Sequence, residues 1–191
     1  VVSATAASNR HEEPASALQF DGSGDYVSVP QANHLEFGTN SFTISFWFRV
    51  SNPKVNGAIG YGDRGDSAGW TTFVNGPAVG SCSLRISDGT HEIGIAASED
   101  FVDGRFHHYA VVVDRAVRGE AILYIDGTEV ASGDMSSLGD INTDDHDDIQ
   151  IGRYWHGQEY NPSFFYDGVL DDVTIFASAL TEAEIQSLAT Q

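Results

Sequence analysis

The stretch FTISFWFRV, residues 42–50, decides the fold class. Its even-numbered positions, from Phe42 to Val50, are apolar, and its odd-numbered positions read Thr, Ser, Trp and Arg. Successive side chains of a strand point to opposite faces, so a period of two over this length predicts a strand with one face on a core. Trp47 lies on the other face, which predicts that this second face is also covered, at least in part.

Similar short alternating runs, separated by Gly, Asn and Asp, occupy most of the chain from residue 17 onward. We expect further strands at 17–20, 26–29, 70–74, 83–87, 92–96, 106–114, 121–125, 149–152 and 169–176. Residues 181–189 have a helical pattern, and Thr181 with Glu184 three positions later predicts a capping box. Many strands and one terminal helix predict an all-β protein, an antiparallel two-sheet β-sandwich with one short C-terminal helix.

The composition limits the partners. The chain has 191 residues, with 28 acidic and 9 basic side chains and a formal net charge of -19. Such a field repels nucleic acid, anionic membranes and strongly anionic polymers. No apolar run is long enough for membrane insertion. The first residues, 1–16, lack a strand pattern and are expected to be a linker or tail before one domain at 17–191.

Five segments then carry a family resemblance. ALQFDGSGDYVSVP, SFTISFWFRV, FHHYAVVVDR with AILYIDGTEV, IQIGRYW and YDGVLDDVTIFASALTEAEIQSL occur in this order over residues 17–188. Together they resemble a laminin-G-like (LamG, pentraxin-type) domain of the concanavalin A-like lectin/glucanase superfamily. The resemblance implies a jelly roll that binds carbohydrate or protein, as an accessory module of a larger secreted, often bacterial, protein. It also implies a structural calcium ion, Ca²⁺.

The acidic residues of this resemblance predict where the calcium ion lies. Asp171 and Asp172 are neighbours on the last strand, so one of them points towards covered ground, where a carboxylate needs a partner or a cation. The resemblance adds Asp21 of the FDG turn, and Asp25 lies four residues further on. Ligation by oxygen atoms alone suits Ca²⁺. Hydrogen bonds from backbone N–H groups are the alternative for these carboxylates.

A second acidic run is open to two interpretations. It comprises Asp144, Asp145, Asp147 and Asp148. It lacks the Gly and the distal Glu of an EF-hand loop. The run is either a solvated loop or a second, weaker Ca²⁺ site.

The predicted ligand site is a loop with many aromatic rings, YWHGQEYNPSFFY, at 154–166. Flat rings stack on sugar faces, and nearby polar groups bind hydroxyls. The candidate ligand residues there are Trp155, His156, Gln158, Glu159, Tyr160 and Asn161. Asp63, Arg64 and Trp70, in the segment that links two strands, are candidates for the rim of the same site. The alternatives are that the aromatic residues, Phe164, Phe165 and Tyr166 above all, cover the sandwich edge, and that the 61–70 segment is an ordinary turn.

Catalysis is not expected. The Glu-x-Asp-x-Glu strand of the retaining glucanases in this superfamily is absent, and no motif supports a lyase set of Tyr109, His107, Arg85 and Gln150. His107 and His108 point to opposite faces of a strand and are expected to be structural.

The sequence therefore predicts a non-catalytic, calcium-stabilised carbohydrate-binding module of a larger protein that is secreted or at the surface of a bacterial cell. Its partners would be a polysaccharide or glycan and the neighbouring domains of its parent. The alternative is a protein-binding or adhesion module of a cell-surface protein.

Overall fold

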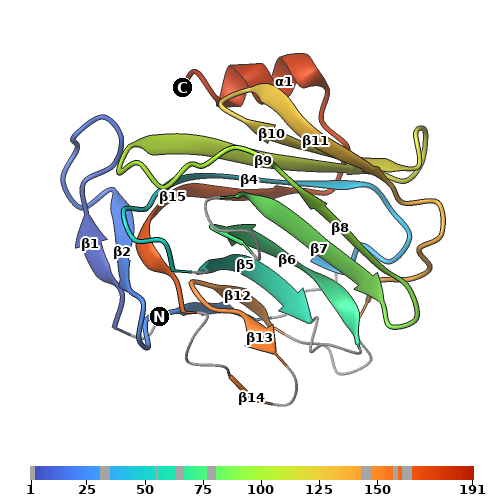
Figure 1. Cartoon of the computed structure of the whole chain (residues 1–191), viewed down its shortest axis with the longest axis horizontal. Helices are drawn as coiled ribbons and strands as arrows, with labels where there is room; N and C mark the ends of the chain where they lie inside the picture. Colours follow the sequence, from blue (N-terminus) through green and yellow to red (C-terminus); the bar gives the residue numbers. More distant parts are fainter. Residues whose placement is uncertain are drawn as a thin grey trace.

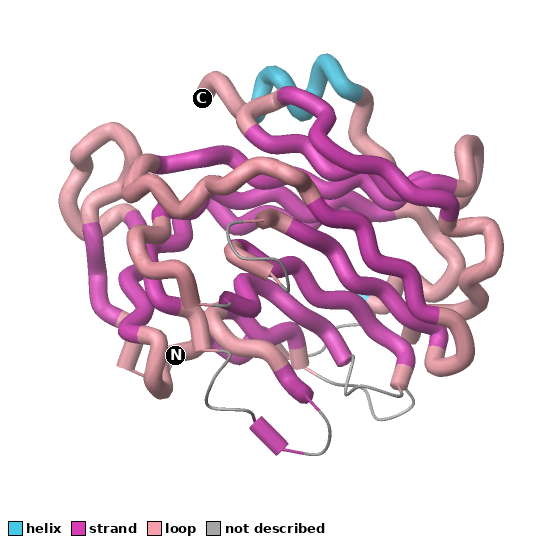
Figure 2. Tube along the Cα trace, viewed as in Figure 1, coloured by secondary structure: helices cyan, strands magenta, loops and turns pink. Residues whose placement is uncertain are grey.

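The computed structural model of the protein describes residues 3–30, 35–54, 56–62, 67–76, 81–142, 148–156, 159–160 and 165–191, with the backbone alone at 56, 155–156 and 159–160. Within these residues the chain forms a seven-stranded sheet, a six-stranded sheet, a two-stranded hairpin and one helix. Every strand pair is antiparallel. Figure 1 and Figure 2 show the sheets as a sandwich with the helix near the C-terminus. The predicted fold class is confirmed.

Each sheet mixes strands from distant parts of the chain. The seven-stranded sheet has the spatial order β1 (Thr5–Ala7), β2 (Ala17–Asp21), β15 (Asp167–Phe176), β4 (Phe42–Arg49), β9 (Phe106–Asp114), β10 (Glu120–Ile125) and β11 (Thr128–Asp134). The six-stranded sheet has the order β3 (Val27–Val29), β12 (Ile149–Ile151), β5 (Asn56–Gly62), β6 (Ala68–Val74), β7 (Ser83–Asp88) and β8 (Glu92–Ala96). β13 (Trp155–His156) and β14 (Glu159–Tyr160) form the hairpin, and α1 spans Glu182–Leu188.

The core lies between the two large sheets, and β4 supplies its centre. The inward residues of β4 and the residue that follows it are at most 1% exposed: Phe42, Ile44, Phe46, Phe48 and Val50. They pack against inward residues of the six-stranded sheet, as the 5.9 Å between the ring centroids of Phe42 and Trp70 illustrates. The single thiol, Cys82, is 0% exposed in the same core, and burial raises its pKa well above the usual value.

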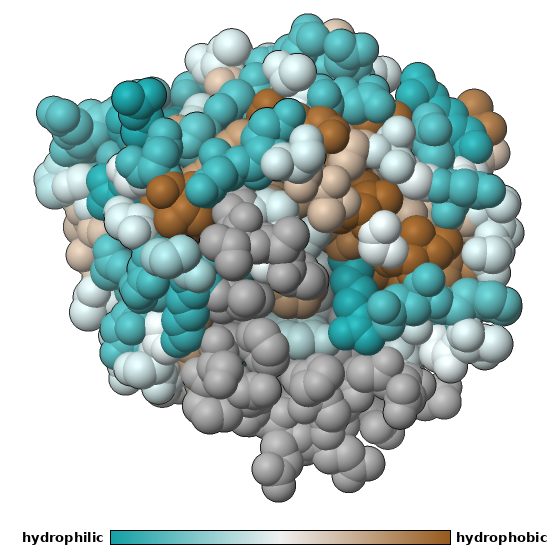
Figure 3. Space-filling view, in the orientation of Figure 1, coloured by the Kyte–Doolittle hydropathy of each residue, from teal (hydrophilic) through white to brown (hydrophobic). Residues whose placement is uncertain are grey.

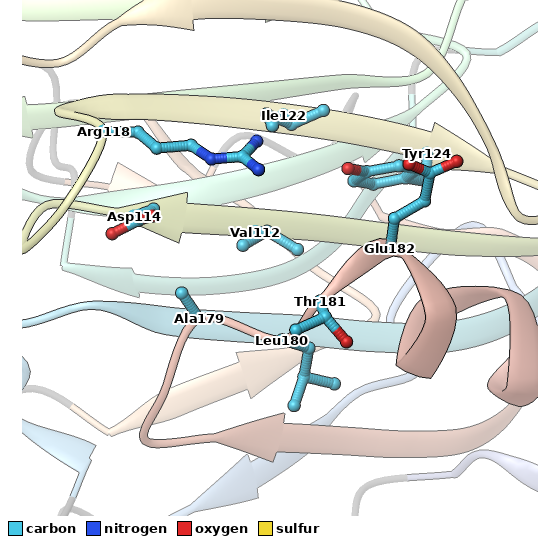
Figure 4. Close-up of a pocket in the computed structure, with 9 residues that line it drawn as sticks. All are labelled: Val112, Asp114, Arg118, Ile122, Tyr124, Ala179, Leu180, Thr181 and Glu182. Carbon is cyan, nitrogen blue, oxygen red and sulfur yellow. The ribbon is translucent and has the colours of Figure 1, made fainter.

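The helix covers part of the outer face of the seven-stranded sheet, the face that points away from the core. Ile185 of α1 packs on Ala110, Val112, Ile122 and Tyr124 of β9 and β10. A cavity of about 150 Å³ remains between these strands and the segment that leads into the helix (Figure 4). The segment before the helix also reaches β4, where the Leu180 backbone N–H donates to Thr43 Oγ1 at 3.0 Å. The outer face of β4, which Trp47 predicted to be covered, is therefore covered at Thr43. Among the described residues, no helix is long and apolar enough to cross a bilayer.

The predicted capping box begins this helix. The Thr181 side chain accepts a hydrogen bond from the Glu184 backbone N–H, and the Thr181 backbone N–H donates to the Glu184 carboxylate at 2.8 Å. This reciprocal pair satisfies two donors that a helix start leaves unpaired. The helix therefore starts where the sequence predicts.

The N-terminal segment belongs to the fold, which corrects the expectation of a linker or tail at 1–16. β1 pairs with β2, from Thr5↔Gln19 to Ala7↔Ala17, and forms the edge of the seven-stranded sheet. Arg10, in the loop that follows, reaches β4 and β15. A three-residue edge strand with two exposed residues has too few apolar positions to show alternation, so the sequence carries no strand pattern here.

Four further strands were not predicted: β5, β11, and the two short strands β13 and β14 of the segment that was expected to be an aromatic loop. β5 reads NGAIGYG, and glycine disfavours strands in general. One of these glycines is required by packing, because a Cβ at Gly57 would lie 2.4 Å from the Cβ of Tyr154. β11 has mostly exposed or half-buried positions and no apolar alternation.

Candidate functional site

The outer face of the six-stranded sheet carries one polar or small residue from each strand. Cross-strand register joins Ser28, Gln150, Gly60, Thr71, Arg85 and Gly94, a set that we name the polar row. The positions that alternate with the row, such as Ile59, Trp70 and Ile86, fill the core. Because strand side chains alternate between faces, the polar row points away from the core.

Contacts of Tyr154 fix the segment that follows β12 on this face. The Arg85 guanidinium donates to the Tyr154 hydroxyl at 2.6 Å and forms an ion pair with Glu92. The Tyr154 ring meets Phe73 edge-on, with 5.0 Å between centroids and 66° between planes. Tyr154 is 4% exposed, and the missing side chain of Gly57 makes room for it.

Arg153 provides a second anchor for the same segment. Its guanidinium lies 3.4 Å from the centroid of the Tyr26 ring, and its Nε donates to Gln150 Oε1 at 2.9 Å. Gln150 Nε2 donates to the Ser28 hydroxyl at 3.2 Å, and that hydroxyl donates to the Asp148 carboxylate at 2.6 Å. Arg153 and Gln150 are both buried, at 7% and 5% exposed. Residues 153 and 154 are thus held on the sheet directly before the hairpin.

The hairpin brings together four of the predicted ligand residues. Trp155 pairs with Tyr160, and His156 pairs with Glu159. Figure 1 shows β13 and β14 beyond β12 at the lower margin of the sandwich, and Figure 3 shows mainly hydrophilic residues around the region in the same orientation. The other predicted residues of these two loops, Gln158, Asn161, Asp63 and Arg64, lie outside the described residues.

Trp70 is not a rim residue, which corrects its assignment to the ligand site. It is 0% exposed, and its register partner Tyr61 is 2% exposed. Trp70 points inward and Thr71 outward, because the strand alternation of β6 places the larger apolar residue in the core. A side chain enclosed between two sheets cannot contact a glycan.

The end of the aromatic loop contributes to the core. Tyr166 is 0% exposed, and its ring meets Phe20 edge-on at 5.8 Å between centroids. Phe165 is half-buried. The alternative that this end of the loop covers the sandwich edge is therefore confirmed for Tyr166, while Phe164 lies outside the described residues.

The predicted calcium ligands fall at two separate places. Asp21 pairs with Asp167 in the register of β2 and β15, so Asp171 lies four residues away along β15, roughly 13 Å at the usual rise per residue. Calcium binds its oxygen ligands at about 2.3–2.6 Å, so Asp21 and Asp171 cannot share one ion. Among the described residues, no group of three or more His, Cys, Asp or Glu side chains could hold a metal.

Arg10 pairs with both acids of β15. Its Nη1 lies 2.9 Å from Asp171 Oδ2 and 2.8 Å from Asp172 Oδ2. Its guanidinium also lies over Trp47, 4.6 Å from the ring centroid. As predicted, one of the two acids is buried: the Asp171 side chain is 3% exposed and that of Asp172 is 63% exposed. The cation that the buried carboxylate needs is an arginine.

Asp21 and Asp25 support their own turn. The Asp21 carboxylate accepts from the Ser23 backbone at 2.8 Å and from the Ser23 hydroxyl at 2.9 Å, and these bonds lower its pKa. Asp25 Oδ2 accepts from the Asp21 backbone N–H at 3.0 Å. Both side chains act as turn acceptors, which matches the alternative of backbone hydrogen bonding. The predicted set of four does not fit one Ca²⁺. In the acidic run, residues 144, 145 and 147 lie outside the described residues, and Asp148 accepts from Ser28.

The two neighbouring histidines point to opposite faces, as predicted. His107 Nδ1 lies 2.7 Å from Asp126 Oδ2, and its Nε2 lies 3.2 Å from Asp103 Oδ1. The bond to Asp126 raises the pKa of His107. His108 Nε2 lies 2.9 Å from the Ser45 hydroxyl, and burial lowers the pKa of His108 to about 4.

The lyase set is divided by the six-stranded sheet. Tyr109 is 0% exposed in the core, and burial raises its pKa well above the usual value. Arg85 and Gln150 are on the outer face of that sheet. These groups therefore cannot act together on one substrate.

Sequence reasoning missed Arg10, Arg153 and the polar row. The partners of Arg10 are 161 and 162 residues away in the chain, so spacing gives no sign of the pairing. The polar row was in principle visible, because the outward positions of each predicted strand follow from alternation. Their alignment across strands depends on register, which only the structure supplies.

The chain is similar in sequence to a known family and to one curated relative. The family model described as the concanavalin A-like lectin/glucanases superfamily (Laminin_G_3) matches residues 21–186. Adhesion G-protein coupled receptor V1 of Danio rerio is 25% identical over 198 residues, covering 96% of this chain. The chain spans only 3% of the length of that receptor.

Three solved structures illustrate the similarity in fold. The binding domain of Paraclostridial Mosquitocidal Protein 1 has a TM-score of 0.77 at 18% identity, covering 98% of this chain and 45% of that one. Domain 4 of AbnA, a GH43 extracellular arabinanase from Geobacillus stearothermophilus in complex with arabinotriose, has a TM-score of 0.74 at 18% identity, covering 99% and 82%. The CBM40 of Ruminococcus gnavus IT-sialidase has a TM-score of 0.64 at 12% identity, covering 87% and 97%. With a family model matched over most of its length and the sandwich that the family predicts, the chain belongs to the Laminin_G_3 family of the concanavalin A-like lectin/glucanases superfamily.

Proposed function

We propose that the protein is a non-catalytic module that binds carbohydrate at the β13–β14 hairpin, which the polar row supports. The observation that carries this proposal is the pairing of Trp155 with Tyr160 and of His156 with Glu159 in one hairpin. Aromatic residues next to an acid and an imidazole supply the stacking and hydrogen-bonding groups that a saccharide requires.

A rigid base supports this role. Tyr154 and Arg153 hold the chain on the sheet immediately before the hairpin, through Arg85 and Gln150. A binding site whose supporting residues are fixed before the ligand arrives loses less conformational entropy on binding. The polar row forms the buried base beneath this anchor, because Thr71 and Gln150 are 1% and 5% exposed and Arg85 and Gln150 hold Tyr154 and Arg153.

The relatives support the class of ligand and the setting. The arabinanase domain of similar fold was solved in complex with arabinotriose, and the sialidase domain is a CBM40. The receptor relative is far longer than this chain, which supports a module within a larger protein. We infer a secreted or cell-surface location on the same grounds.

One observation favours a second function, a protein-binding or adhesion module. The relative that matches 96% of this chain in sequence is an adhesion receptor. In that case the same hairpin contacts a partner protein.

Binding to a glycan array separates the two functions. We expect the wild-type chain to bind at least one neutral glycan, and Trp155→Ala and Tyr160→Ala to abolish that binding without changing the melting temperature. His156→Ala should weaken the same binding, and His91→Ala is its matched control, because the His91 side chain is 54% exposed on the β7–β8 turn. Binding of no glycan, or unchanged binding by Trp155→Ala, contradicts the proposal.

A structural calcium ion remains a proposal that rests on the family resemblance alone. Because a ligand bound to the folded state stabilises it, EDTA should lower the melting temperature by several degrees, and excess Ca²⁺ should restore it. An unchanged melt contradicts the calcium proposal and leaves carbohydrate binding untouched.

A further inference from the structure

A polar cavity lies on the other side of the molecule from the polar row. It has a volume of about 320 Å³ and lies at the outer face of the seven-stranded sheet. Its lining residues are Gln19, Arg49, Ser51, Asn52, Gly104, Asp167, Gly168 and Val169. This volume is at the lower end of the range for small-molecule sites, about 300–1,000 Å³. Neither the proposed hairpin site nor the Arg10 contacts include these residues.

Strand register builds the floor of this cavity. Gln19 of β2, Val169 of β15, Arg49 of β4 and Phe106 of β9 lie opposite one another across four adjacent strands. The Arg49 guanidinium lies over the Phe106 ring, 4.7 Å from its centroid. A cation on an aromatic face is held in place without using its hydrogen-bond donors.

Arg49 differs from the other lysines and arginines that the structure describes. Each of the others has a hydrogen bond or an ion pair with the protein: Arg10, Lys54, Arg85, Arg105, Arg115, Arg118 and Arg153. Among the described residues, Arg49 has no hydrogen bond or ion pair, and its guanidinium contacts the face of the Phe106 ring. In a chain with a net charge of -19, a half-buried guanidinium that has no carboxylate partner among the described residues can donate to another molecule.

The other polar groups of the cavity offer acceptors. Gln19 uses its amide N–H₂ on the carbonyl oxygens of Phe20 and Gly168, at 2.8 and 3.1 Å. Asn52 uses its N–H₂ on Asp167 Oδ2 at 3.0 Å. Within the part of the chain that the structure describes, no donor reaches the carbonyl oxygen of either amide, so each oxygen can accept a hydrogen bond. A donor fork thus lies in one cavity with amide oxygens and a carboxylate.

We propose that this cavity binds one unit of a neutral saccharide through adjacent hydroxyl groups. A hydroxyl both donates and accepts, so neighbouring hydroxyls match Arg49 on one side and Gln19, Asn52 or Asp167 on the other. A free anion matches Arg49 alone and is repelled by Asp167 and by the overall charge. The inference rests on the proposed carbohydrate-binding function and adds a second contact site, on the opposite sheet from the hairpin.

Nuclear magnetic resonance with ¹⁵N-labelled protein tests the site directly. The probes are arabinotriose, cellotriose, maltotriose and mannotriose, with glucuronate and inorganic phosphate as anionic probes. The Arg49 Nε–Hε signal is assigned by its disappearance in Arg49→Lys, a variant that keeps the charge but loses the planar fork. We expect a neutral trisaccharide to shift this signal. We also expect Arg49→Lys to weaken its binding by about ten-fold or more, since a hydrogen bond to a charged group contributes on this scale.

Matched variants make each outcome decisive. Arg105→Lys is the control, because the Arg105 side chain is 83% exposed and does not line the cavity. Unchanged saccharide affinity in Arg49→Lys, with shifts confined to residues around 153–160, overturns this site and leaves the proposed function standing. A shift of the Arg49 signal by the anionic probes alone overturns the neutral-saccharide assignment. Absence of shifts with every trisaccharide overturns the proposed function and this inference together.

Discussion

Removal of the Arg10 guanidinium should destabilise the fold more than a typical surface substitution. Arg10→Met keeps most of the aliphatic length but leaves Asp171 in a covered position without its cation. The Arg10 and Asp171 side chains are 10% and 3% exposed, so solvent screens this pair little. Removing one partner of a buried ion pair costs about 3–5 kcal/mol when burial is complete, so we expect about 2–4 kcal/mol here.

The loss of stability should appear in both thermal unfolding and urea unfolding. At this chain length, each kcal/mol lowers the melting temperature by roughly 2–4 °C, so a fall of roughly 5–15 °C is expected. Asp172→Asn serves as the control, because its side chain is 63% exposed and exposed pairs contribute about 0–1 kcal/mol. A double-mutant cycle of Arg10→Met with Asp171→Asn should return a coupling energy of about 2 kcal/mol.

The pH dependence of the Arg10→Met penalty gives an independent check. Burial raises the pKa of Asp171 above its usual value even beside Arg10. The folded protein therefore binds this proton more tightly than the unfolded chain, and protonation favours folding as the pH falls through the folded-state pKa. The penalty should shrink in acid, where Asp171 is neutral. A penalty below about 0.5 kcal/mol at pH 7, or one that is equal at pH 3.5 and pH 7, would refute the reasoning.

Three other substitutions test the packing and charge of the fold. Gly168→Ala places a Cβ 2.4 Å from the Arg49 carbonyl oxygen and should cost about 2–3 kcal/mol, whereas Gly24→Ala, with nothing within 4 Å, should be close to neutral in urea unfolding. His107 has a raised pKa, so its contribution to stability is complete below the unfolded-state pKa near 6.5 and is lost as the pH rises through the folded-state pKa. His107→Gln should remove this pH dependence of stability. Parallel stability curves of the two proteins from pH 6 to 8.5 would contradict this prediction. Thr181→Ala should lower stability by about 1 kcal/mol, and no change in thermal unfolding would show that the cap is not needed.

The sequence predicted the layers of the fold better than their edges. β4 and β9 lie in the middle of a sheet, where burial on one or both faces makes the apolar pattern strong. β1 is a short edge strand, and β5 contains Gly57, which packing against Tyr154 requires, so neither shows that pattern. The apolar alternation of a strand thus reflects its burial. It is weak where the strand is exposed or where another segment packs closely against its backbone.

The candidate site was predictable as a list of residues but not as an arrangement. The aromatic loop marked the hairpin residues, because so many rings in one irregular segment are rare. Trp70 carried the same chemical label and lies in the core, since identity alone does not decide on which face of a strand a residue falls. The contacts of Arg10 and the cavity at Arg49 form between residues that are far apart in the chain. No local spacing in the sequence therefore predicts either of them.

The burial of Cys82 has a practical consequence for studying this protein. A thiol reagent reacts with the thiolate, which is both enclosed and disfavoured in the native core. Labelling must therefore wait for an opening that exposes the space between the two sheets. The modification rate of this one side chain then reports the rate or population of that opening. Mass spectrometry can measure it in crude mixtures without an added dye or an engineered tag.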